Sequence, residues 1–184
     1  AAGDETLADV RLIANGDITQ SAAGIITADE LGVRQQAADL LAANDLDANT
    51  RYDIQLGDAN DVNHLAALNQ FDGGVIAFND ADDLTINTVS AQTIDGVAFT
   101  AISGVQTTFS GAAVQGALDS AAGDILIQAG GFLTLNQQVN AGRAAAGDET
   151  LADVRLIANG DRSEERRGGK EGTSSCRSRW APYH

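Results

Sequence analysis

Short segments in which apolar and polar residues alternate recur along the chain. Each is only a few residues long and is bounded by residues that favour turns. Alternation with a period of two is typical of β-strands that bury one face. The pattern therefore predicts an all-β chain of many short strands, at 10–13, 18–20, 25–27, 53–56, 75–78, 84–87, 97–100, 125–128 and 132–135.

The residues between these segments suit a chain that bends sharply every few residues. Asn, Asp and Gly precede the segments that start at Ile18, Leu84 and Ile125, and these residue types tolerate left-handed or positive-φ backbone. We identify no strong hairpin dipeptide, and the spacing is too short for crossover helices, so antiparallel meanders and strand–helix units fit poorly. A parallel β-helix of roughly 20 residues per turn fits better and predicts about seven or eight turns for residues 1–161.

One stretch departs from this pattern. Apolar residues in 29–44 recur near helical spacing behind an Asp-Glu pair. We expect an excursion at 35–46, either a loop or a short helix that leaves one turn. Such an excursion could carry binding specificity, or it could be an inserted loop without a role.

Composition divides the chain into two parts. Residues 1–161 hold 23 acidic and five basic side chains, a net charge of −18, whereas the whole chain carries −15. The single Pro, Trp, Cys and Lys all lie in 162–184. This tail resembles the translation of a sequencing-library adapter, and the alternative is a natural basic, disordered tail. We therefore expect 1–161 to be the folded unit and, because the chain contains no Met, an excerpt.

Residues 1–17 recur without a change at 145–161. A recently duplicated 144-residue unit would give two identical segments, and the chain would then be one period and a stub of the next. An assembly artefact would give the same result. The sequence leaves both explanations open.

Three segments resemble repeats of bacterial filamentous-haemagglutinin-like and autotransporter-type adhesins: 16–36, 60–97 and 123–142. The resemblance covers most of 7–161. It implies a right-handed, single-stranded parallel β-helix, displayed extracellularly on the bacterial cell surface as the shaft of a large adhesin. Its partners would be neighbouring coils of the same parent chain, with host or surface glycans or proteins as further partners. The Asn-Pro motifs of the family's secretion domain cannot occur here, because the only proline is Pro182.

Parallel β-helices also carry polysaccharide lyases and glycoside hydrolases, which need converging acids in one groove. The alternative function is therefore a carbohydrate-active enzyme. However, acidic residues at these positions also suit the corners that cap strands. In addition, residues 1–161 contain few basic side chains that could bind a sugar-acid substrate. We nominate no catalytic residue, and the best acidic cluster would be Asp80, Asp82 and Asp83, with Asp58, Asp61 and His64 nearby.

Calcium binding is the other function that such acidic residues can serve, since Ca²⁺ takes carboxylate and carbonyl ligands. The calcium β-roll nonapeptide is missing, and the D-x-D at 80–82 lacks the rest of an EF-hand loop. We predict no metal ligand and no cofactor, although calcium binding stays open. The strong negative charge argues against nucleic acid, and no apolar run approaches the roughly 18 residues of a membrane span.

Overall fold

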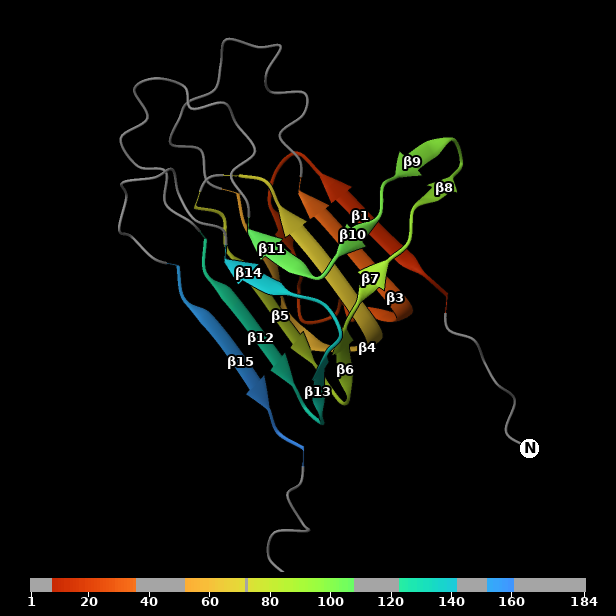
Figure 1. The fold of residues 1–184 in the computed structure, drawn as a ribbon. Helices are drawn as coiled ribbons and strands as arrows, with labels where there is room; N and C mark the ends of the chain where they lie inside the picture. The colour runs from red at the N-terminus through yellow and green to blue at the C-terminus, as the bar shows by residue number, and fades with distance from the viewer. Residues whose placement is uncertain (1–7, 36–51, 72, 108–122, 142–151, 161–184) are drawn as a thin grey trace, which may run out of the picture.

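The computed structural model describes residues 8–35, 52–71, 73–107, 123–141 and 152–160 (Figure 1). Within these ranges the chain forms strands and turns and no helix, which confirms the prediction of an all-β fold. Eleven strands join into one large sheet in which every neighbouring pair is parallel. None of the described residues forms a helix long and apolar enough to cross a membrane.

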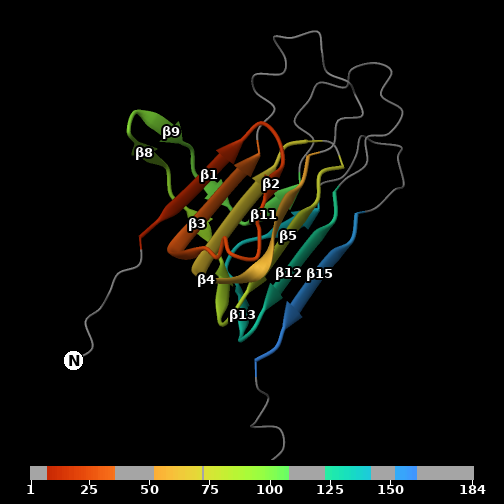
Figure 2. The same cartoon turned by 180° about the vertical axis from the view of Figure 1, so that it is seen from behind.

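The large sheet consists of two stacks of strands. Stack B contains, in order, β2 (Ile18–Thr19), the first half of β4 (Ile54–Asn69), β5 (Ile76–Asp80), β12 (Ile125–Ala129) and β15 (Val154–Ala158). Stack A contains β1 (Val10–Ala14), β3 (Thr27–Gln35), the second half of β4, then the short strands β6 (Leu84–Ile86) with β11 (Val105–Thr107) and β13 (Leu133–Leu135) with β14 (Val139–Ala141). Figure 2 shows stack B from behind.

The chain alternates between the two stacks, so each passage through both adds one level. In the described residues this gives five levels, of which β1 and β2 form the first and β13, β14 and β15 the last. The long strand β4 belongs to two levels, because its register shifts between Leu56 and Asn60 where it passes from stack B to stack A. This winding is compatible with a parallel β-helix.

Apolar side chains that face inward from both stacks form one core. Equivalent residues of successive levels pair in register. Along stack B these include Ile18, Ile54, Ile76, Ile125 and Val154. Burial of each large aliphatic side chain contributes on the order of 1.5–3 kcal/mol. The largest fully buried members are Leu31, Ile54, Leu65, Ile76, Leu84, Ile86, Ile125 and Ile127.

Between β6 and β11 the chain leaves stack A and forms an antiparallel excursion, residues 87–104 (Figure 1). There β7 (Thr88–Val89) pairs with β10 (Ile102–Ser103), and β8 (Gln92–Ile94) pairs with β9 (Val97–Phe99). Asp95 and Gly96 connect β8 and β9 with φ values of 49° and 81°, as a two-residue I′ hairpin turn requires. Our expectation that the chain lacks a strong hairpin dipeptide was therefore wrong.

The inner side of the excursion covers the outer face of stack A. Its side chains Val89, Phe99 and Ile102 form a second buried cluster with Ala66 of β4, against which Leu68 packs. A Cβ added to Gly32 of β3 would lie 2.7 Å from Phe99 Cζ, so only glycine permits this close approach. The centre of stack A is thus buried on both faces.

Two further expectations are corrected by the fold. The near-helical spacing in 29–44 does not give a helix at its start, because Asp29 to Gln35 belong to strand β3; the remainder of the expected excursion at 35–46 lies outside the described residues, as does the tail at 162–184. The described chain has five levels instead of seven or eight turns. The reason is longer connections: Ile18, Ile54, Ile76 and Ile125 occupy successive levels but lie 36, 22 and 49 positions apart.

Candidate functional site

Buried polar side chains close each level where the chain turns from stack B to stack A. Asn60, fully buried at the end of one stack B strand, accepts the backbone N–H of Ile26 through Oδ1 at 3.0 Å. One level on, Asp80 is 2% exposed and accepts the N–H of Val62 through Oδ2 at 3.0 Å. Asn60 and Asp80 pair in register. The same corner is therefore closed in the same way at two successive levels.

The opposite corner, where stack A leads into stack B, is closed by a second polar column. Gln35, Asn69 and Thr107 stack in register and are all buried. Gln35 Nε2 donates to Gly16 O at 2.6 Å, Asn69 Nδ2 to Tyr52 O at 2.9 Å, and Thr107 Oγ1 to Gly123 O at 2.9 Å. Each side chain satisfies a carbonyl that the turn would otherwise leave without a bond.

Aspartates just before the stack B strands bind the neighbouring level. Asp17 Oδ1 accepts the N–H of Asp53 at 2.8 Å, Asp53 Oδ1 that of Val75 at 2.9 Å, and Asp124 Oδ1 that of Asp153 at 2.9 Å. Val75 occupies the middle level of this column, so no more than two aspartates are adjacent along the described column. The column therefore gains charge-assisted hydrogen bonds with limited repulsion between carboxylates.

Asp80 is the one aspartate of the described residues that is buried. Burial raises the pKa of its carboxyl from 3.8 to about 7, and the N–H groups of Asp82 and Val62 act in the opposite direction. The neighbouring charge of Asp82 raises the pKa further. Asp80 is thus an acid whose charge costs free energy in the folded state at neutral pH.

The predicted acidic cluster lies at two successive corners. Asp82 and Asp83 are exposed, and Asp83 Oδ1 accepts the N–H of Phe132 on the next level at 2.7 Å. Asp80 is held inside the core by its own two backbone contacts. The carboxylates of Asp80 and Asp83 therefore accept different backbone N–H groups, and the side chain of Asp82 lies close to that of Asp80.

The other predicted residues sit on the preceding corner and strand. Asp58 and Asp61 are partly exposed, and their backbone N–H groups bond to Gln20 Oε1 and Ile26 O. His64 is partly exposed on β4, with a buried Nδ1 that has no hydrogen-bond partner. Within the described ranges, no three His, Cys, Asp or Glu side chains are arranged to hold a metal ion.

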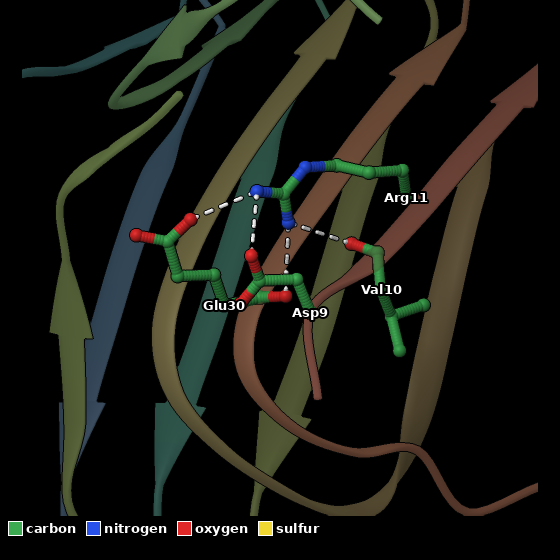
Figure 3. Close-up of polar contacts among 4 residues, drawn as sticks. All are labelled: Asp9, Val10, Arg11 and Glu30. Carbon is green, nitrogen blue, oxygen red and sulfur yellow. Dashed lines mark hydrogen bonds and ion pairs between the residues drawn. The ribbon is translucent and has the colours of Figure 1, made fainter. Parts of the chain in front are cut away.

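A cleft of about 350 Å³ lies between the outer face of stack A and the excursion. Arg11 lines this cleft, and its side chain is only 3% exposed. Figure 3 shows its contacts with Asp9, Val10 and Glu30. The guanidinium donates to Glu30 Oε2 at 2.8 Å and to Glu30 O and Val10 O at 3.1 Å, and it reaches Asp9 Oδ2 at 3.5 Å. It also lies 5.5 Å from the centre of the Phe99 ring, within cation–π range. The lining is Asp9, Arg11, Asp29, Glu30, Ser90, Ala91 and Gln92.

The chemistry of this cleft is ion pairing and hydrogen bonding. Its carboxylates already have protein partners, since Asp9 and Glu30 bind Arg11 and Asp29 accepts from Asn63 Nδ2 at 2.9 Å. The arrangement fixes β1 against β3 and holds the excursion above them. Sequence reasoning missed it, because Arg11 and Glu30 meet only once the strand register is set.

The polar columns had a weak sequence signal. Leu31, Val33 and Gln35 share one parity along β3, so the alternation that buries the first two also points Gln35 inward. No comparable signal gave the partners of these side chains. Comparison with protein-family models, curated proteins and solved structures gives no match.

Proposed function

We propose that this chain is a segment of a right-handed parallel β-helix that serves as the structural shaft of a large secreted or surface-displayed bacterial adhesin. In this role the segment holds distal binding regions away from the cell. Its partners are neighbouring coils of the same parent chain, and host or surface glycans or proteins are bound beyond it. The observation that carries the proposal is the repeated closure of successive levels by buried Asn60 and Asp80 at one corner and Gln35, Asn69 and Thr107 at the other.

A shaft must resist bending and extension along its axis. Each level of this chain is bonded to the next by parallel backbone ladders in both stacks, and aspartate side chains before stack B add a bond at three of the four steps between levels. The buried corner side chains Asn60, Asp80, Gln35, Asn69 and Thr107 each make at least one hydrogen bond to the backbone of the fold, and this favours stiffness. A net charge of −18 over residues 1–161 favours mutual repulsion of neighbouring shafts.

Surface display is tested with antibodies raised against this chain. They should label intact source cells, and protease treatment of those intact cells should remove the label while an internal marker protein survives. Labelling that requires permeabilised cells would refute the proposal. A crystal structure of the chain tests the handedness and the β-helix separately.

The carbohydrate-active alternative predicts turnover. Acidic and neutral polysaccharides are incubated with the chain, and reducing ends and unsaturated uronic products are measured. The use of Asp80 and Asp83 as acceptors for backbone N–H groups supports the structural role. Product release that Asp83→Asn abolishes, with the fold retained by circular dichroism, would replace the shaft proposal with an enzymatic one.

A further inference from the structure

The described parts of the two identical segments, residues 8–16 and 152–160, form the same strand but occupy different places in the fold. Val10–Ala14 is β1 and Val154–Ala158 is β15, with the same five residues in each strand. In the strand order β1 and β15 stand at opposite ends, β1 in stack A and β15 in stack B (Figures 1 and 2). From β1 to β15 the chain thus advances four and a half levels.

β1 and β15 have the same sequence but pair through opposite strand edges. β1 pairs with β3, on the level after it, whereas β15 pairs with β12, on the level before it. In both stacks the N–H of an inward-facing residue donates to the following level, as Ala67 does to Gly104 O and Ile125 to Asp153 O. Val154 is in register with Ile125. Its N–H therefore points away from β12, toward the side on which β1 binds β3.

Side-chain burial differs between the copies in the same sense. Val10 and Leu12 pack against the main core, but Val154 and Leu156 are 45% and 37% exposed. Arg11 is buried against Glu30 and Phe99, while Arg155 is exposed. Within the described residues β15 thus presents, unused, the groups with which β1 binds β3.

We propose that a second copy of this chain supplies the missing partner: β15 of one copy takes the place of β1 on β3 of the next. Arg155 then pairs with Glu30 of the next copy, and β2 of that copy lies beside β14. Because β1 and β15 lie four and a half levels apart, each copy is rotated by half a turn relative to the previous one. At about 4.8 Å per level, each copy lengthens the fibre by roughly 22 Å. The product is a head-to-tail fibre. This goes beyond the shaft role and does not depend on surface display; it applies to the chain as given, since in a longer parent chain the next coil would occupy the same edge of β15.

The exchange is favoured because it replaces one set of contacts with an identical set and also covers the edge of β15 that pairs with no described strand. Unpaired strand edges are templates for another chain. The in-chain β1 competes at a high effective concentration. Assembly should therefore depend on protein concentration.

Cysteine cross-linking tests the register in the full chain, with Cys176 replaced by serine. Ile13 is opposite Arg34 in the β1–β3 pair, so exchange places Ile157 opposite Arg34 of the next copy. The pair Ile157→Cys with Arg34→Cys should give a ladder of cross-linked dimers, trimers and larger species. The control pair Ile13→Cys with Arg34→Cys should cross-link within one chain at low concentration. If only Ile157→Cys with Ile13→Cys links chains, the copies stack without exchange and the proposal is wrong.

A second experiment compares the same substitution in the two copies of the segment. Arg11→Glu opposes Glu30 and weakens the in-chain β1, so it should promote association. Arg155→Glu opposes Glu30 of the next copy and should reduce association. We expect the midpoint concentration, measured by sedimentation velocity, to shift by about threefold in opposite directions. Both variants have the same composition and charge, so equal shifts, or no association of the parent chain at any concentration, would overturn the proposal.

Discussion

Replacement of Asp80 with asparagine should stabilise the chain at neutral and alkaline pH. Asp80 is 2% exposed, and its carboxyl pKa is raised from 3.8 to about 7, mainly by burial. The folded state therefore holds the proton more tightly than the unfolded chain does. Stability is highest when Asp80 is protonated, falls as the pH rises from about 4 to about 7, and stays low above that range.

The size of the effect follows from the two pKa values. A rise from 3.8 to about 7 corresponds to roughly 4 kcal/mol of lost stability above pH 7. An asparagine amide removes the charge and keeps one acceptor for the N–H of Val62, as Asn60 does for Ile26 one level earlier. It loses the second acceptor, which binds the N–H of Asp82 at 3.2 Å, at a cost of about 1 kcal/mol. The net gain should be about 3 kcal/mol above pH 7 and should vanish near pH 4.

Urea unfolding followed by circular dichroism between pH 4 and pH 8 measures this gain. Asp83→Asn is the matched control, because Asp83 is exposed and accepts one backbone N–H. The control keeps the buried Asp80 carboxyl, so its stability should fall with rising pH as that of the parent chain does. A difference between parent and Asp80→Asn that stays constant with pH would refute a buried charge at this corner.

Three other substitutions probe the core, the excursion and its hairpin. Leu65→Ala, at a side chain 1% exposed, should cost about 2–5 kcal/mol of unfolding free energy in urea. Gly32→Val should cost about 1–3 kcal/mol, because its Cβ would meet Phe99 at 2.7 Å; an unchanged urea midpoint would mean that the excursion is not seated on stack A. Gly96→Ala, at φ 81° with open space around it, should destabilise the hairpin by about 1 kcal/mol, seen as faster amide exchange confined to β8 and β9.

The alternating pattern predicted four of the five stack B strands, namely β2, the first half of β4, β5 and β12, but not β15. Ile54–Leu56, Ile76–Phe78 and Ile125–Ile127 are inward at alternate positions with one exposed or half-exposed residue between. A strand that buries only one face alternates apolar and polar residues, and this alternation is visible in the sequence. The same argument located β1 and β6.

The alternating pattern did not predict the second half of β4, and the reason is physical. Leu65, Ala66 and Ala67 are all buried, because the core covers one face and the excursion covers the other. A strand buried on both faces does not alternate. The polar columns and the Arg11–Glu30 pair depend on the register between strands far apart in the chain, which local sequence does not encode. The identical segments of β1 and β15 make the same point, since one sequence yields one local structure in two different environments.

The side chains that close the corners of each level affect which insertions and deletions such a chain can tolerate during evolution. Equivalent stack B positions lie 36, 22, 49 and 29 residues apart, yet the pairing register is maintained throughout, and aspartate corner bonds recur at three of the four steps. Insertions and deletions between levels are therefore decoupled from the core that supports them, because the closing side chains reset the geometry before the next strand begins. The connections between levels, and not the corner residues themselves, are therefore the natural places to graft foreign peptides, such as epitopes or tags, into a rigid scaffold.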